Sequence, residues 1–510
     1  MSFVSYGFPL FVGALLGVYC LLPQKKRWWA LLIGSWGFYA LAGVYCLPFL
    51  ALTTGTVYLG GLQLGRMGER EKSYLFAHKD LTKEEKKAVK AKGKARRRLA
   101  FLSVLLLNLG ILAGCKYFGL FAKISGGILL PVGLSFYMFQ GLGYLIDVQR
   151  GKYSPEKHFF RFALFISFFP QLIQGPISRY DSLSKTLFSG TLPTWDTGEK
   201  GLLRMLWGYF KKLVIADRLT EAVAACFSLT APSGAVTALG MVLYAIRLLC
   251  DFTGGMDIAL GAAALFGVAP MENFHAPYLS KGLAEYWNRW HISMGSWFRD
   301  YIFYPLSISK PMLKLNTALR RKYREGFFTR LPLYMAILVT WLATGLWHGS
   351  GWNYALWGLS NGLLLIFSQE LEPLYAAFRN RHPRLEKSGA FGVFRILRTF
   401  MLLCCLRLWD VFYTPAGTIN AFLSLFLCPN FGALMSLWPS FNLGAFDLWV
   451  LGLGLIPVAV LDIRKDKGKP LYPKSSGLRW LCIGLLLLLV LTLGVYGMGY
   501  TASDFIYGRF

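Results

Sequence analysis

Long apolar runs separated by short polar segments dominate the sequence. About twelve of these runs approach the roughly 20 residues that a membrane-spanning helix needs, among them 8–22, 28–45, 47–64 and 100–118. This pattern predicts an all-α, polytopic membrane protein with about 10 to 13 transmembrane helices. The first run has no basic residue before it and no small-residue cleavage site after it, which favours a retained span over a signal peptide.

The middle of the chain, from 159 to 300, departs from this regular pattern. Its apolar runs are interrupted by the residues Pro170, Gly175, Pro176, Asp217, Arg247, Asp251, Gly254, Gly255 and Asp257. Non-helical backbone at membrane depth survives only where protein buries it or water lines it. We therefore expect re-entrant or interfacial helices around a central chamber in this region.

Basic residues fall mostly between the apolar runs, and they account for the net charge of +28. Clusters at 25–27, 66–98, 310–330, 379–398 and 464–469 follow the positive-inside pattern, which predicts that these segments are cytoplasmic and both termini extracytoplasmic. This distribution argues against a nucleic-acid partner. The nine cysteines are scattered and indicate neither disulfides nor a metal site.

We expect one membrane-embedded domain over 1–510. The segment 1–125 supplies N-terminal spans, with 66–98 as a charged surface helix touching anionic lipid. The segment 126–370 forms the core that carries the chemistry, and 371–510 adds C-terminal spans.

Two of the six histidines, His291 and His348, lie among tryptophans within apolar sequence. Ionisable side chains inside a membrane are rare and are often functional. The stretch 287–301 predicts an amphipathic interfacial helix in which Trp287 and His291 share one face. An aromatic belt with a structural histidine explains the same stretch.

His348 follows an uncharged run, 331–347, that starts at a basic cluster. Helical rise carries it about 25 Å from the cytoplasmic end, into the outer half of the bilayer. Gly345 and its neighbours Gly349 and Gly351 permit close approach of a helix or substrate. A neutral imidazole there suits general base catalysis, although a satisfied core histidine is the alternative.

Arg247 and Asp251 are spaced as an i,i+4 pair. A buried pair that holds the fold is one interpretation. In the other, Asp251 orients a catalytic group or helps a substrate to enter.

Seven blocks in order over 130–362 resemble the membrane-bound O-acyltransferases, in particular the bacterial branch that contains alginate O-acetylation proteins and teichoic acid D-alanyl transferases. The blocks are Leu130–Gln140, Phe169–Tyr180, Lys211–Arg218, Asp251–Asp257, Glu272–Tyr278, Trp287–Tyr301 and Thr344–Gly358. The resemblance implies that His348, in Gly-Leu-Trp-His-Gly, is catalytic and that His291 lines the same chamber. It suggests supporting roles for Trp287, Asn288, Arg289, Trp290, Trp347, Asp251, Arg299, Asp300 and Asn361.

The chain departs from the alginate pattern at two points. Ser307 to Lys310 replaces a Gly-Gly-Asn-Arg segment, and Asn361 stands where a histidine is often found. Both departures concern the acceptor and the donor rather than the two histidines. We expect the two histidine rings to lie within about 15 Å of each other in one chamber.

The resemblance implies a transferase of the bacterial cytoplasmic membrane. It would move a short acyl group, with acetyl as the favoured group, from a cytoplasmic thioester (acetyl-coenzyme A or an acyl-carrier protein) to a hydroxyl of an extracytoplasmic polymer or a relay protein. We expect no bound cofactor or metal. We do expect a secreted or periplasmic partner protein. D-alanyl transfer from a carrier protein to teichoic acid is the alternative within the enzymes, and a transporter or flippase is the alternative of another class.

Overall fold

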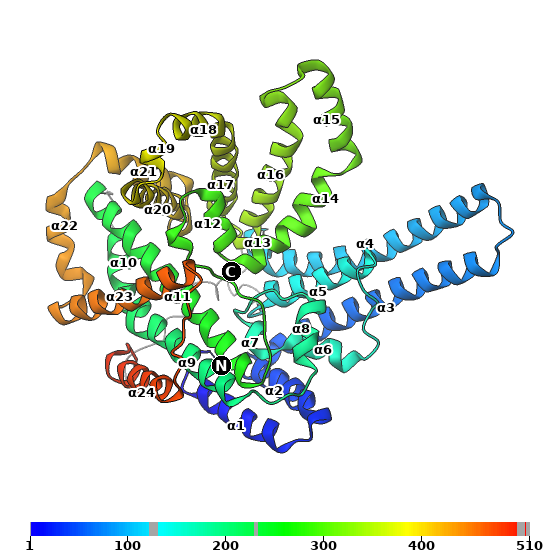
Figure 1. The fold of residues 1–510 in the computed structure, drawn as a ribbon, viewed down its shortest axis with the longest axis horizontal. Coiled ribbons are helices and arrows are strands. Elements are labelled where there is room, and N and C mark those ends of the chain that lie inside the picture. Colours follow the sequence, from blue (N-terminus) through cyan, green and yellow to red (C-terminus); the bar gives the residue numbers. More distant parts are fainter. Residues whose placement is uncertain (1, 122–130, 229–232, 497–504, 506–510) are drawn as a thin grey trace. The chain divides into compact units, whose positions relative to one another are not determined.

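The computed structural model describes residues 2–121, 131–228, 233–496 and 505 (Figure 1). Those residues form helices joined by turns and contain no strand, so the all-α prediction is confirmed. Residues 127–130 and 497–498, which belong to two expected runs, lie outside the described residues, as does Leu130 of the first sequence block.

The chain divides into two compact units. The first comprises Met1–Met205 and Ala259–Met271, and the second comprises Leu206–Ile258 and Glu272–Phe510. The helices of the first unit are α1 (Gly7–Leu21), η1 (Gln24–Lys26), α2 (Arg27–Ala42), η2 (Val44–Cys46), α3 (Leu47–Ala77), α4 (Lys83–Phe121), α5 (Leu134–Gln149), α6 (Phe159–Ser167), α7 (Phe169–Leu172), α8 (Tyr180–Leu187) and the start of α9 (Trp195–Tyr209).

The basic segment 66–98 forms the far ends of α3 and α4, which run antiparallel beside each other (Figure 1). Arg97 and Glu71 join the two helices through an ion pair of 2.8 Å. A capping box begins α4, because the Thr82 amide donates to the Glu85 carboxylate and the Glu85 amide donates to the Thr82 hydroxyl. The expected surface helix is therefore two helices with a short turn between them.

The interruption expected after residue 159 is present in the first unit. Helix α6 ends at Ser167, and α7 starts two residues later. The Phe169 amide at this break donates to the Ser35 hydroxyl at 3.1 Å. A side chain of α2 thus satisfies backbone that the break leaves without a helical partner.

The second unit is longer and carries the two histidines. Its helices are η3 (Phe210–Ala216), η4 (Asp217–Leu219), α10 (Thr220–Phe227), α11 (Gly234–Leu265, to Ile258 in this unit), η5 (Pro277–Leu279), α12 (Leu283–Arg289), α13 (Ile292–Phe298), η6 (Arg299–Phe303), α14 (Tyr304–Ser307), α15 (Lys310–Tyr323), α16 (Phe327–His348), α17 (Trp352–Glu370), α18 (Glu372–Arg381), α19 (Pro383–Glu386), α20 (Gly389–Val411), α21 (Pro415–Leu427), α22 (Phe431–Leu437), η7 (Trp438–Phe441), α23 (Ala445–Asp466) and α24 (Ser476–Leu493).

Within the described residues, seven helices are long and apolar enough to cross a membrane. The pair 415–427 and 431–441, bent by 119°, makes an eighth if it is one span. This count is below the expected 10 to 13 because several apolar runs form short helices: α1 has 15 residues, and α2 and α5 have 16 each. Such helices are about 24 Å long, whereas the hydrocarbon core is about 30 Å thick. The protein is a multi-pass membrane protein, and its orientation stays a prediction.

Helices α16 and α17 form a tight hairpin. A Cβ atom added at Gly345 would lie 2.2 Å from the Tyr354 carbonyl oxygen, and one added at Gly358 would lie 2.3 Å from that of Trp341. Glycine at the first position allows the close approach expected from the sequence. At the other end of the hairpin, Arg330 and Glu370 form an ion pair of 3.0 Å.

Candidate active site

The rings of the two histidines both contact the ring of one tryptophan, Trp347. The ring centroid of Trp347 is 6.1 Å from that of His291 and 4.9 Å from that of His348. The histidine rings are therefore no more than about 11 Å apart. Both histidines are buried, with exposed fractions of 0% and 4%.

His348 is the last residue of α16, so the predicted run brings it to the end of a helix. Its ring contacts Trp357 on α17, with centroids 4.6 Å apart. Trp357 in turn meets Trp287, with centroids 5.6 Å apart. Ring contacts thus connect His348 on α16 through Trp357 on α17 to Trp287 on α12.

The prediction that Trp287 and His291 share a face of one helix is wrong. Helix α12 ends at Arg289, α13 begins at Ile292, and His291 lies between them in the left-handed region with φ of +47°. The break persists because its backbone bonds to another segment: the Ile292 amide donates to the Asn273 carbonyl at 2.9 Å. A non-glycine residue held at positive φ is strained, and such residues gather at functional sites.

The side chain of Asn273 binds the residues that follow the break. Its Oδ1 accepts a hydrogen bond from the Ser293 amide at 2.9 Å and lies 3.3 Å from His291 Nδ1. Its Nδ2 lies 3.4 Å from the sulfur of Met256 on α11. Phe252, also on α11, meets the His291 ring with centroids 4.9 Å apart.

A cavity of about 660 Å³ lies between α12, α13, η6, α16 and the end of α17. Its walls are mostly aromatic and aliphatic, and its polar residues include Thr340, Thr344, Gln369 and Glu372. Among the described residues, the indole Nε1 of the cavity-lining Trp287 has no hydrogen-bond partner. A pocket of this size accommodates a small molecule or the end of a longer one.

Four of the predicted supporting residues line the cavity: Trp287, Asn288, Trp290 and Arg299. The two histidines do not belong to its lining, and neither does Trp347. They are one side chain removed from it, because Trp347 contacts the cavity-lining Phe298 with centroids 6.3 Å apart. The cavity and the histidines are therefore neighbours.

The other predicted supporting residues lie elsewhere. Arg289 forms ion pairs of 2.5 Å with Glu285 and Asp466, and Asp300 is a half-exposed neighbour of Arg299. Asn361 is buried on α17, where its Nδ2 donates to the Trp357 carbonyl at 2.8 Å. It thus lies one turn beyond the tryptophan that meets His348.

The predicted Arg247–Asp251 pair is wrong, since no ion pair joins these residues in the described part of the chain. Asp251 instead lies 2.7 Å from Lys212, which also lies 2.8 Å from Asp217. Lys212 belongs to η3, a π-helix, whose wider turn buries two consecutive lysines. Spacing along α11 does not reveal a partner that another helix supplies.

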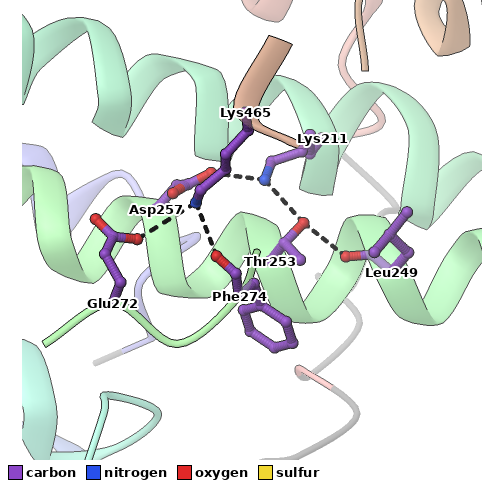
Figure 2. Close-up of polar contacts among 7 residues, drawn as sticks. All are labelled: Lys211, Leu249, Thr253, Asp257, Glu272, Phe274 and Lys465. Atoms are coloured by element: carbon purple, nitrogen blue, oxygen red, sulfur yellow. Dashed lines mark hydrogen bonds and ion pairs between the residues drawn. The ribbon is translucent and has the colours of Figure 1, made fainter. Parts of the chain in front are cut away.

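The second lysine of this turn, Lys211, pairs with Asp257 at 2.6 Å and donates to Thr253 at 2.8 Å (Figure 2). Close to it, Lys465 from the end of α23 donates to the Phe274 carbonyl at 2.8 Å and lies 3.5 Å from Glu272 (Figure 2). Lys465 therefore holds the residues on both sides of Asn273.

Sequence reasoning missed Arg407 on α20. Its guanidinium donates to the Tyr286 hydroxyl and to Asp410, both at 2.9 Å, and its carbon lies 5.0 Å from the Trp290 ring centroid. An arginine and an aspartate three residues apart in an apolar span were the available signal. Asn273 was missed as well, although it belongs to one of the recognised blocks.

Burial lowers the pKa of His291, which lies outside the spanning helices, to about 3. Its imidazole is therefore neutral at physiological pH, because the interior disfavours the charged form. Within the described residues, no group of three His, Cys, Asp or Glu side chains could hold a metal ion.

Known proteins resemble the chain over most of its length. A sequence model of the membrane-bound O-acyltransferase family matches residues 154–319. The protein named probable alginate O-acetylase of Pseudomonas putida is 34% identical over 379 residues, which cover 71% of this chain and 69% of that protein. Its namesake in Pseudomonas fluorescens is 33% identical, over 71% of this chain and 65% of its own length. The teichoic acid D-alanyltransferase of Bacillus subtilis is 28% identical, over 54% and 66%.

An all-helical membrane fold with a buried histidine pair beside a cavity is consistent with these matches. The chain belongs to the membrane-bound O-acyltransferase family. The family and the names of the relatives support an O-acyltransferase enzyme. The matched region spans about two thirds of the length of the alginate relatives.

Proposed function

We propose that the protein transfers a short acyl group, acetyl in the first instance, from a thioester donor to a hydroxyl of a cell-envelope polymer or of a relay protein. One observation carries the proposal: His291 and His348 contact the same tryptophan, and that tryptophan adjoins a cavity large enough for the reactive end of a donor. The two alginate relatives, by their names, favour acetyl over D-alanyl.

The cavity suits the thioester end of the donor. It extends from Gln369 and Glu372, at the end of the α16–α17 hairpin that the basic clusters predict to be cytoplasmic, to Thr344, one turn before His348. Its mostly apolar walls disfavour water beside a bound thioester, which water would hydrolyse. The indole N–H of Trp287 is a hydrogen-bond donor available to an acyl carbonyl.

His348 is the proposed general base. The acceptor oxygen attacks the thioester carbonyl carbon while His348 takes the hydroxyl proton; the carbon–sulfur bond then breaks, and the leaving thiolate recovers that proton. The products are an ester and a free thiol. Positioned proton transfer of this kind contributes about 10²- to 10⁴-fold to a rate.

The donor is proposed to be acetyl-coenzyme A or an acyl-carrier protein, and a secreted or periplasmic partner is proposed to complete the transfer. The exposed lysines and arginines of α15 support an anionic donor, because they carry five positive charges within one helix: Lys310, Lys314, Arg320, Arg321 and Lys322. D-alanyl transfer from a carrier protein is the second candidate, favoured by the name of the B. subtilis relative.

His348→Ala tests the proposal. Purified protein in proteoliposomes should lose transfer from the acyl thioester by at least about a hundredfold. His382→Ala is the matched control, because that histidine is exposed at the end of α18. If the protein were a transporter, His348→Ala could leave transport intact. Full acyl transfer by the variant would contradict the role of His348 as the general base.

Assays with two different donors distinguish which acyl group the protein transfers. Turnover of acetyl-coenzyme A or an acetylated carrier favours acetyl transfer. Turnover only with a carrier whose phosphopantetheine arm bears D-alanine favours the second candidate.

A further inference from the structure

The hydrogen bonds of Asn273 determine which nitrogen of His291 carries a proton. The Ser293 amide donates to Oδ1 of the Asn273 side chain at 2.9 Å. A backbone N–H can only donate, so the atom it meets is the acceptor, Oδ1. This contact fixes the orientation of the amide without reference to the histidine.

The same Oδ1 lies 3.3 Å from His291 Nδ1. Since Oδ1 is an acceptor, Nδ1 must be the donor and must carry a proton. Burial holds the pKa of His291 near 3, so the ring has a single proton in the physiological range. Nε2 then bears a lone pair, because a neutral imidazole has one N–H and one acceptor nitrogen.

Neighbouring contacts hold this arrangement in place. Lys465 fixes the peptide on each side of Asn273 through Glu272 and Phe274 (Figure 2). The His275 amide donates to the Arg289 carbonyl at 2.9 Å, just before the break that carries His291. The hydrogen bond made by Nδ1 determines which ring nitrogen of His291 carries the proton. Contacts that hold Asn273 in place therefore also maintain the tautomer.

We propose that Asn273 is a positioning residue that holds His291 as the Nδ1–H tautomer, so that His291 Nε2 accepts a hydrogen bond from an O–H of the acyl acceptor. His291 therefore orients the acceptor and does not donate to the acyl carbonyl. A polysaccharide presents adjacent hydroxyls, of which one can bind His291 while its neighbour gives its proton to His348. The tautomer is independent of the acyl-transfer proposal, whereas its use in the reaction rests on it.

The tautomer can be observed without any activity. The chain has six histidines, so protein labelled with ¹⁵N-histidine gives a small set of ring-nitrogen signals in solid-state NMR of proteoliposomes. The signals of His291 are those lost in His291→Gln. They should show a protonated Nδ1 and an unprotonated Nε2 from pH 6 to 8. Protonation at Nε2, or a charged ring, would overturn the proposal.

Substitutions of Asn273 test the positioning role. Asn273→Ala should mix the tautomers of His291 and reduce transfer about 10- to 100-fold, as loss of the hydrogen-bond partner of a metal-bound histidine does. Asn108→Ala is the control, since Asn108 is equally buried and hydrogen-bonded but bonds only within α3 and α4. In a His291→Ala background, Asn273→Ala should have little further effect on transfer. An equal loss in both backgrounds would mean that Asn273 acts only on the fold.

Asn273→Asp separates positioning from packing through the pH profile. Its carboxylate accepts the same two hydrogen bonds, but it favours the imidazolium and raises the pKa of His291 by roughly 1 to 3 units. Transfer should therefore recover at pH 7 and fall as the pH drops from about 6 to about 4, because the imidazolium has a proton on Nε2 and cannot accept. The unsubstituted protein should lack this step. Identical profiles for the two proteins would refute the role given to Nε2.

Discussion

Substitution of Gly345 tests whether the α16–α17 crossing positions His348. In Gly345→Ala, the new Cβ would lie 2.2 Å from the Tyr354 carbonyl oxygen, whereas ordinary contacts start near 3.4 Å. The backbone atom cannot rotate away, so the two helices must separate by about 1 Å. Overpacking of this kind costs about 1 to 3 kcal/mol of unfolding free energy. A displacement of about 1 Å near a reacting group also costs about a hundredfold in rate.

The assay combines thermal unfolding in detergent with acyl transfer at a temperature where the variant is fully folded. Gly452→Ala on α23 is the matched control, because a Cβ there meets no atom within 4 Å and alanine favours the helix. Gly362→Ala should fall between the two, since its nearest contact would be the Trp341 side chain at 3.2 Å. Wild-type stability and transfer in Gly345→Ala would refute this account of the crossing.

Two further substitutions probe buried charges. Arg407→Leu leaves Asp410 buried without its 2.9 Å partner and should cost about 3 to 5 kcal/mol of unfolding free energy, measured by chemical unfolding. The double variant Arg407→Leu, Asp410→Leu should cost less, because no unpaired charge stays buried. Equal losses in the single and double variants would contradict the pairing. Lys212→Met leaves two buried aspartates and should cost a similar amount, part of which returns when Asp217→Asn and Asp251→Asn are added. Lys200→Met, at an exposed pair with Asp196, should cost under about 1 kcal/mol by the same measurement.

The sequence predicted well the features that depend on local pattern. Apolar runs such as 331–347 identify spans because the hydrocarbon core demands internal hydrogen bonding over a fixed length, and α16 follows that run. The two histidines were recognisable from their apolar, tryptophan-rich surroundings, and the structure brings their rings together around Trp347. Their catalytic roles stay predictions.

Features that depend on contacts between distant segments were not predictable in the same way. Helical spacing suggested Arg247 as the partner of Asp251, but a lysine from a π-helix more than 30 positions away occupies that place. The same spacing put Trp287 and His291 on one helix face, yet hydrogen bonds from the Asn273 segment stabilise a break between them. Spacing along one helix carries no information about Lys212 or about the Asn273 segment, because both belong to other parts of the chain.

The two sides of the cavity are built from different kinds of elements. The α16–α17 side is joined by a glycine crossing near one end and by the Arg330–Glu370 ion pair at the other, so it resists sliding. The opposite side consists of seven-residue helices separated by a left-handed residue and followed by a π-turn. When a bulky donor has to enter and a product has to leave, we expect this second side to move, which would make substrate exchange and the alignment of His291 two outcomes of one motion.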